Sequence, residues 1–169
     1  KDGWIEYKGE SIEICNSQQY GVYEDIIHKF IEQLDIAYLK HRRLLVVRLE
    51  YKINYYTENN KLFSNHMKNI IQWLRREYGI RNIGYLWVRE QEKSKKQHYH
   101  LALILDGNKI QHPEKINAVF KNKWLPRGGI FIPENCYYYI DKHNYKKQRQ
   151  DVIYRCSYLA KSRGKGFRP

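Results

Sequence analysis

Two kinds of hydrophobic periodicity alternate along the chain from residue 44 onward. Residues 44–53 carry apolar side chains at every second position, which is the period of a β-strand. Apolar residues in 63–78 return at helical spacing, and Gly79 follows as a C-cap. Residues 83–90 and 98–105 are predicted as the two strands of a hairpin. Another helix is predicted to begin at Pro113. Two short strands, at 128–133 and 136–141, and a last helix at 151–163 complete the predicted elements.

This order, β-α-β-β-α-β-(β)-α, predicts an α+β domain of ferredoxin-like architecture, with a central antiparallel sheet of about five strands and helices packed on it. In that arrangement the strand 98–105 lies centrally, antiparallel to the strand 44–53. Ahead of this domain, residues 4–7 and 12–15 are predicted as a small hairpin around Gly9, and a helix is expected from Tyr20 to about His41. We therefore divide the chain into an N-terminal extension, 1–41, and a main domain, 42–169, that together form one compact unit.

The net charge of the 169-residue chain is +13, which indicates an anionic partner, with nucleic acid favoured over a membrane surface. Sixteen tyrosines and four tryptophans could stack on the bases of a single strand, although they could equally fill a core. No stretch approaches the roughly 20 apolar residues of a membrane span. The three cysteines form no CxxC pair, so neither a disulfide framework nor a zinc knuckle is indicated, and we expect a cytoplasmic protein.

Two histidines, His98 and His100, stand one residue apart at the start of an apolar strand, so both imidazoles point to the same face. They could cap the strand and face water, or they could share a divalent metal ion. A hairpin with its tip near residue 94 places residue i opposite residue 188 − i, so that Glu90 lies opposite His98. Two histidines and a carboxylate suit Mn²⁺ or Mg²⁺ and leave coordination positions open. Glu50 on the neighbouring strand is the second choice for the carboxylate, and Glu92 has the right parity but falls in the loop.

The last predicted helix separates an apolar face from a polar one. On the polar side Tyr154, Tyr158 and Lys161 fall together. Such tyrosines could be amphipathic core residues, but a phenolate is also a competent nucleophile toward a phosphodiester polarised by a metal. Lys161 could contact the phosphate or favour the phenolate.

The C-terminal region supplies the positive charge that a nucleic acid would require. Residues 141–169 hold nine lysines and arginines against two aspartates, a local net charge of +7. The candidates for DNA contacts are Arg149, Arg155, Arg163 and Lys165.

These motifs carry a resemblance to a known family. His98-Tyr99-His100 before an apolar strand resembles the His-hydrophobic-His motif of the HUH endonucleases, and Tyr158-Leu159-Ala160-Lys161 resembles their Tyr-x-x-Lys motif. Tyr99 departs from the usual aliphatic residue and could instead contact DNA. The SYLAK string, with Tyr154 four residues before Tyr158, is most similar to the filamentous-phage (inovirus gene-two-like) and prophage replication initiators of the YagK/YfjJ type. The resemblance covers roughly residues 43–163.

The resemblance implies a replication initiator that nicks and rejoins single-stranded DNA in rolling-circle replication of a phage or prophage. Tyr158 would attack a phosphate held by a metal ion on His98, His100 and Glu90, giving a 5′-phosphotyrosine and a free 3′-OH. Tyr154 would serve a second strand transfer. The implied partners are single-stranded DNA at a replication origin and a host helicase, in the cytoplasm of a bacterial host cell.

Two other functions remain open at this point. A non-catalytic module similar to an RNA-recognition domain uses the same ferredoxin-like scaffold and places aromatic residues on the sheet. An HUH transposase or relaxase would keep the same motifs and cut a different DNA.

Overall fold

The computed structural model describes residues 2–15, 21–91 and 97–161. The chain begins with the strands β1 (Asp2–Tyr7) and β2 (Glu10–Cys15), followed by helix α1 (Glu24–His41). From residue 44 the elements follow the predicted order, which confirms the α+β class. They are β3 (Leu44–Lys52), α2 (Lys61–Tyr78), β4 (Gly84–Gln91), β5 (Gln97–Asp106), α3 (Glu114–Trp124), β6 (Ile130–Phe131), β7 (Tyr137–Ile140), α4 (Tyr145–Cys156) and the 3₁₀ helix η1 (Ser157–Ala160).

The main sheet is antiparallel and has the strand order β4-β5-β3-β6, with β7 pairing β3 as well. The strand β5 is central, as the ferredoxin-like arrangement requires. Its register with β4 places Glu90 opposite His98, so the predicted hairpin register is confirmed. Its register with β3 places Glu50 opposite His100.

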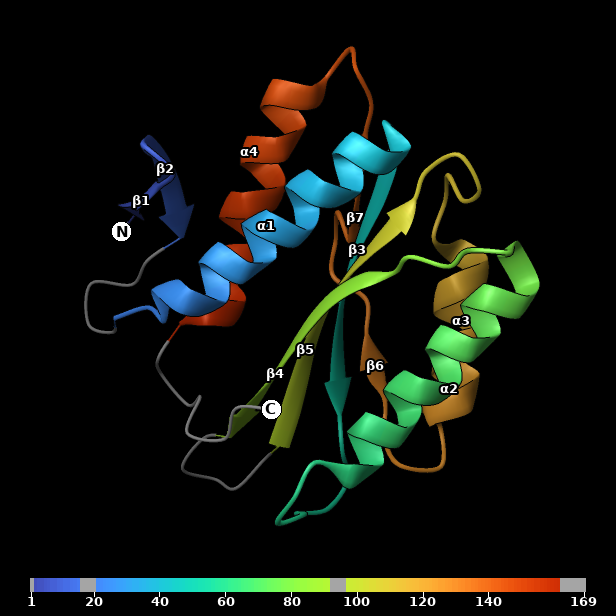
Figure 1. Ribbon diagram of the computed structural model, residues 1–169. Coiled ribbons are helices and arrows are strands. Elements are labelled where there is room, and N and C mark those ends of the chain that lie inside the picture. Colours follow the sequence, from blue (N-terminus) through green and yellow to red (C-terminus); the bar gives the residue numbers. More distant parts are fainter. Residues whose placement is uncertain (1, 16–20, 92–96, 162–169) are drawn as a thin grey trace.

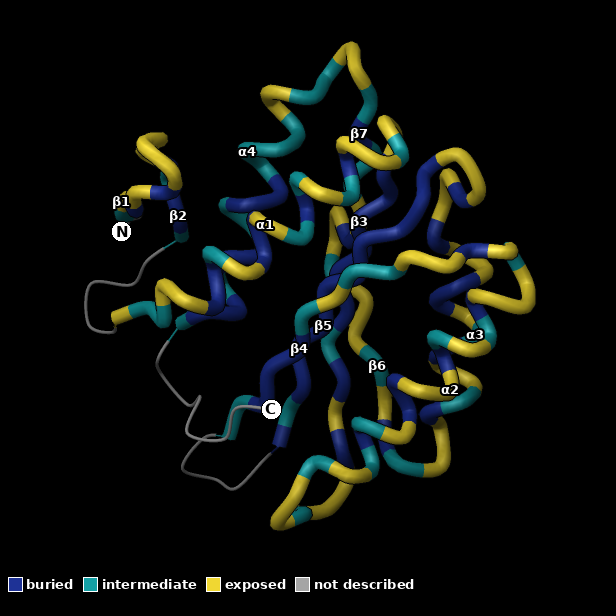
Figure 2. Tube along the Cα trace, in the orientation of Figure 1, coloured by how far each residue is buried: buried dark blue, intermediate teal, exposed yellow. Residues whose placement is uncertain are grey.

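Alternation along β3 divides its side chains between two hydrophobic cores. Leu45, Val47 and Leu49 pack with residues of α2 and α3 on one face of the sheet. Leu44 and Val46 pack on the other face with residues of α1 and α4. Figure 1 shows these two pairs of helices on opposite sides of the sheet, and Figure 2 shows β3 and β5 buried between them. Both faces of the sheet are therefore covered by helices.

The N-terminal extension belongs to the second of these cores. Ile12 and Ile14 of β2, Phe30 and Ile31 of α1, and Val152 of α4 are all buried within the same cluster. Burying each such apolar side chain stabilises the fold by about 1.5–3 kcal/mol. The hairpin and α1 are thus packed onto the main domain through a continuous apolar core.

The predicted boundaries of the last helix are wrong. It begins at Tyr145, so the basic run before residue 151 lies inside the helix rather than ahead of it. Lysine, arginine and glutamine are good helix formers, and a reading based on apolar spacing alone overlooks them. The α-helix ends at Cys156, where four residues continue as the tighter helix η1. The first helix also begins later than predicted, at Glu24.

Among the described residues, no helix is both long enough and apolar enough to cross a membrane.

Candidate functional site

The two histidines lie at the end of the sheet where β5 begins and β3 and β4 finish. Cross-strand register puts Glu50, Glu90, His98 and His100 on one face of the sheet, because directly opposite residues share a face. This is the face covered by α1, α4 and η1. The sequence therefore predicted correctly that Glu90, His98 and His100 share a face, and Glu50 of the neighbouring strand lies on this face too.

The side chains pair diagonally rather than with the residue directly opposite. His98 Nδ1 lies 3.3 Å from Glu50 Oε1, and His100 Nε2 lies 3.3 Å from Glu90 Oε1. Each imidazole thus has its own carboxylate, and both Glu90 and Glu50 are near the histidines. Glu92, the other carboxylate considered, lies outside the described residues.

The two histidines differ in their surroundings. The side chain of His98 is 27% exposed, whereas that of His100 is only 3% exposed. Burial lowers the pKa of His100 below its ordinary value, and the hydrogen bond to Glu90 opposes this shift without cancelling it. His100 is therefore a neutral imidazole near pH 7, which is the protonation state that binds a metal.

The donor atoms fit a divalent metal ion, but their present arrangement is that of two separate His–Glu pairs. Imidazole nitrogens and carboxylate oxygens are suitable ligands for Mn²⁺ and related ions. The Nδ1 atom of His100 is buried and has no hydrogen-bond partner, so this imidazole has an unused donor or acceptor position. Within residues 2–15, 21–91 and 97–161, no three His, Cys, Asp or Glu side chains are gathered closely enough to hold an ion as they stand.

Both candidate nucleophiles open into the same pocket as His100. This pocket has a volume of about 300 Å³. The main sheet contributes Arg48, Glu50 and His100, and α4 and η1 contribute Tyr154, Arg155 and Tyr158. The remaining lining residues are Cys15, Phe131 and Pro133. The rings of Tyr158 and His100 meet edge to face, with their centroids 5.5 Å apart. Lys161 Nζ lies 4.7 Å from the centroid of the Tyr158 ring, within the range of a cation–π interaction.

The segment that carries Tyr158 is held in place by the N-terminal extension. Ser157 is buried; its Oγ donates to the Tyr154 carbonyl at 2.6 Å and accepts the Cys15 backbone N–H at 2.9 Å. The backbone N–H of Tyr23 donates to the Ala160 carbonyl at 2.8 Å, at the other end of η1. These bonds satisfy backbone groups at a helix end and fix the orientation of Tyr158 toward the pocket.

Several residues of this pocket were not among the sequence candidates. Arg48 alternates with Glu50 on β3, so the polar face of that strand was an available signal for it. Phe131 and Pro133 come from β6 and the segment after it, and no motif marks them. Phe131 pairs in register with Glu50, which places its 52% exposed ring on the site face.

Tyr99 lies on the opposite face of β5. It is 1% exposed, stacks on Phe63 with centroids 4.3 Å apart, and donates its hydroxyl to Asn60 Oδ1. The prediction that Tyr99 could contact DNA is therefore wrong, because this aromatic residue fills the core between the sheet and α2.

The four basic candidates for DNA contacts have different environments. Arg155 lines the pocket and donates to the Glu134 carbonyl at 3.2 Å. Arg149 instead bonds both carboxylate oxygens of Asp35, at 2.8 and 3.0 Å, and also reaches Glu10 at 3.1 Å. The charge of Arg149 is thus paired within the protein, which argues against a DNA contact at this residue. Arg163 and Lys165 lie outside the described residues.

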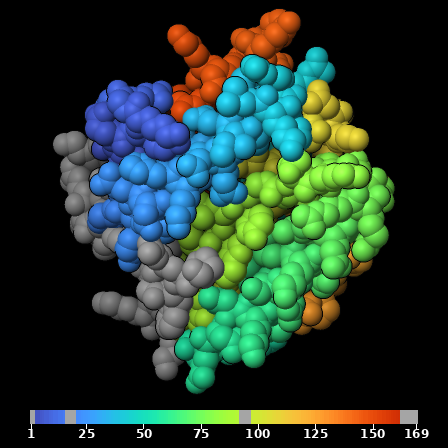
Figure 3. All heavy atoms as spheres, in the orientation of Figure 1, coloured from blue at the N-terminus to red at the C-terminus, as the bar shows by residue number. Residues whose placement is uncertain are grey.

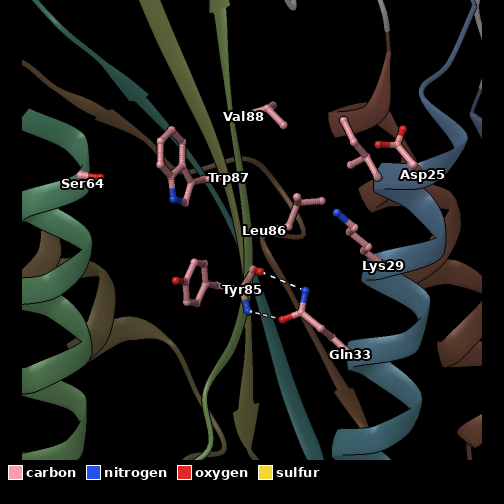
Figure 4. A pocket seen from close by; sticks show the side chains of 9 residues that line it. Asp25, Lys29, Gln33, Ser64, Tyr85, Leu86, Trp87 and Val88 are labelled. Carbon is pink, nitrogen blue, oxygen red and sulfur yellow. Dashed lines mark hydrogen bonds between the residues drawn. The ribbon is translucent and has the colours of Figure 1, made fainter. Parts of the chain in front are cut away.

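A larger pocket, of about 470 Å³, lies elsewhere and contains none of the sequence candidates. This pocket lies along β4, and β4 reaches the molecular surface between α1 and α2 (Figure 3). Figure 4 shows Gln33 of α1 bonding both backbone groups of Tyr85, at 3.1 and 3.2 Å. Because β4 is an edge strand, the Gln33 amide makes the hydrogen bonds to Tyr85 that a further strand would otherwise make.

Comparison with known proteins relates the whole of the main domain to one family. Residues 8–169 match the model of the YagK/YfjJ C-terminal domain family. The "Uncharacterized protein YagK" of Escherichia coli (strain K12) is 26% identical over 99 residues, which cover 48% of this chain and 48% of YagK. The chain thus aligns with about half the length of that relative. No solved structure matches the chain significantly.

Proposed function

This chain belongs to the YagK/YfjJ C-terminal domain family, and we propose that it is a metal-dependent HUH endonuclease that nicks and rejoins single-stranded DNA. The proposed biological role is initiation of rolling-circle replication of a phage or prophage at its origin, with a host helicase as the further partner. One observation carries the proposal: Tyr154 and Tyr158 open into one pocket together with His100 and Glu50.

The proposed reaction exchanges one phosphodiester for another. The Tyr158 hydroxyl oxygen forms a bond to phosphorus as the bond to the 3′ oxygen breaks. The phenol loses its proton, the leaving 3′ oxygen gains one, and the strand downstream of the cut stays joined to the tyrosine through its 5′ phosphate. Since no bond energy is lost to hydrolysis, the 3′-OH can reverse the step without a nucleotide cofactor.

The side chains around the pocket have distinct parts in this reaction. His98, His100 and Glu90, with Glu50 nearby, would hold the divalent ion, Mn²⁺ or Mg²⁺, which supplies polarisation of the phosphate. Lys161, whose Nζ lies over the Tyr158 ring, would contact the phosphate or favour the phenolate of Tyr158. Tyr154, which lines the same pocket, would carry out the second transfer that strand exchange requires.

An open sheet that binds bases would favour the non-catalytic alternative instead. Modules of the RNA-recognition type stack bases on aromatic residues of an exposed sheet face. In this fold α1 and α4 cover one face and α2 and α3 cover the other. The helix-covered sheet therefore supports the endonuclease proposal over that alternative.

Trapping of a covalent adduct tests the proposal. The protein is incubated with Mn²⁺ and a random-sequence pool of single-stranded oligonucleotides labelled at the 3′ end, and the products are separated on a denaturing gel. A 5′-phosphotyrosine leaves the 3′ label on the protein, whereas 5′-labelled DNA is only shortened. We expect Tyr158→Phe to eliminate the labelled protein, because phenylalanine keeps the ring and removes only the attacking oxygen.

The other tyrosines of the helix provide the controls. Tyr154→Phe should leave the first cleavage intact and impair only strand transfer. Tyr145→Phe removes a hydroxyl from the same helix, where the ring stacks on Tyr38 away from the pocket, and should change neither step. If only Tyr154→Phe removes the first adduct, the assignment of the two tyrosines is reversed. If the wild-type protein forms no adduct, the endonuclease proposal is wrong.

A further inference from the structure

Arg48 is a buried arginine on the face of the sheet that carries the candidate site. It lies on β3, opposite Ala102 of β5 and two residues before Glu50. Only 5% of its surface is exposed, yet it lines the pocket shared by His100, Tyr154 and Tyr158. Its guanidinium group is therefore withdrawn from bulk water and adjacent to the reactive groups.

The hydrogen bonds of Arg48 leave part of its guanidinium group without a partner. Nη1 donates to the backbone carbonyls of Leu49 and Leu101, at 3.0 and 3.2 Å. Nε is buried and has no hydrogen-bond partner. Among the residues whose placement is described, no carboxylate lies within ion-pair distance of Arg48. Removing an ion from water costs several kcal/mol unless a counter-charge and hydrogen bonds compensate for it.

The neighbours of Arg48 supply only part of that counter-charge: Glu50 favours its charged form through space but forms no ion pair with it. Glu50 is paired with His98. Burial raises the pKa of Cys156 to about 12, so its thiol is neutral at physiological pH. Arg155 adds a second positive charge beside Arg48. The pocket therefore has an excess of positive charge around Tyr154 and Tyr158.

We propose that Arg48 is a phosphate-binding catalytic residue, whose guanidinium group hydrogen-bonds the DNA phosphate that the tyrosine attacks. This role rests on the proposed function, because that function places the attacked DNA phosphate in the pocket. A guanidinium presents several N–H donors in a plane and matches the oxygens of a phosphate. It is already in place, on a side chain that is itself largely buried, when charge increases on those oxygens during the reaction.

A nuclear magnetic resonance titration tests binding separately from chemistry. The Nε–Hε signal of Arg48 is identified by its loss in Arg48→Lys. Inorganic phosphate, and then a short single-stranded oligothymidylate, are added to the wild-type protein without metal. We expect the signal to shift and to saturate with both probes. If it stays unchanged at saturating DNA, whether or not other pocket signals move, the proposal is overturned. Because no cleavage is measured, this result does not depend on adduct formation.

Single-turnover kinetics test the catalytic part of the role. With DNA saturating, Arg48→Met should slow adduct formation by about 100-fold, and Arg48→Lys by less, since lysine keeps the charge but loses the planar arrangement of donors. Arg43→Met is the matched control, because it removes an equal charge at an exposed position just before β3. An unchanged rate in Arg48→Met would overturn the proposal.

Thermal unfolding separates this role from a structural one. Replacing a buried charge that has no ion-pair partner by methionine should leave the melting temperature unchanged or raise it. A structural arginine would lower it. A variant that is as stable as the wild type and slow in cleavage supports the proposal, whereas a destabilised variant that cleaves at the wild-type rate contradicts it.

Discussion

At the scale of single residues, His98 and His100 occupy similar positions on β5 but differ in burial. His98 is partly exposed beside Glu50, and His100 is enclosed beside Glu90 and the ring of Tyr158. An imidazole that is kept neutral by burial can bind a metal without first losing a proton. In the proposed metal site, His100 would fix the position of the ion and His98 would close the site from the solvent side.

Removal of both imidazoles should therefore separate cleavage from binding. We expect the double variant His98→Ala, His100→Ala to lose the covalent adduct and to retain most of its affinity for single-stranded DNA, which fluorescence anisotropy measures. In the wild type, Mn²⁺ should support cleavage at lower concentration than Mg²⁺, because imidazole nitrogens suit Mn²⁺ better. Cleavage by the double variant would show that the histidines only terminate the strand.

Another buried histidine, His66 of α2, lies in the other core, where its Nε2 is 2.8 Å from the Tyr51 hydroxyl. Burial, together with the charges of Arg127 and Lys123, lowers its pKa to about 3 from 6.5. The unfolded chain therefore binds a proton at His66 in a pH range where the folded protein does not. The stability contributed by the neutral imidazole is complete above pH 6.5 and is lost as the pH falls toward 3.

Urea unfolding as a function of pH measures this loss. Between pH 6.5 and pH 4 the contribution of His66 to the free energy of unfolding should fall by up to about 1.4 kcal/mol per pH unit. His66→Gln keeps a hydrogen-bonding group near Tyr51 and does not titrate, so its stability should depend less on pH. Parallel curves for the two proteins would contradict the assignment.

At the scale of secondary-structure elements, Arg149 joins three segments that are distant in sequence. Its guanidinium group, with 12% of the side chain exposed, connects α4 to Asp35 of α1 and to Glu10 of β2. The hydrogen bonds to Asp35 raise the pKa of Arg149 above its already high value. Because α4 continues into η1, this contact helps to hold the segment of Tyr158 against the sheet.

We expect Arg149→Met to lower the free energy of unfolding by about 1–2 kcal/mol, as for hydrogen bonds to charged groups. A double-mutant cycle with Asp35→Asn should show that the two side chains are coupled. Lys147→Met provides the control on the same helix, since the ion pair of Lys147 with Asp151 is exposed and should contribute little. Equal stability losses in the two variants would contradict a structural role for Arg149.

At the scale of the whole molecule, the net charge of +13 would govern the affinity for the proposed partner, single-stranded DNA. Each phosphate neutralised by a lysine or arginine releases counterions, so log K should fall with log salt by about 0.7 per contact on a single strand. The slope for Arg149→Met should equal that of the wild type, because its charge is already paired. Arg155→Met should reduce the slope by about 0.7. Affinity that does not change with salt would contradict the electrostatic account.

The sequence by itself determined the order of the elements and the face on which each strand residue lies. Alternation in β3 separates Leu45 and Val47 from Arg48 and Glu50, and the short hairpin fixes the register of Glu90 with His98. These properties follow from local geometry, since a strand has a period of two and a short connection leaves few registers. As predicted, Tyr154 and Tyr158 are not among the buried apolar residues of α4 and η1, although the chain changes from an α-helix to a 3₁₀ helix between them.

Only the tertiary structure decided which carboxylate meets which histidine, and which polar groups are withdrawn from water. His98 pairs with Glu50 rather than with Glu90, and Arg48 is buried, because α4, η1 and the N-terminal extension cover that face of the sheet. Arg149 has the same side chain as the exposed Arg43, but the packing of α4 against α1 places Asp35 within its reach. A sequence period specifies a face within one element; the elements that cover this face come from distant parts of the chain, and their packing sets side-chain partners and burial.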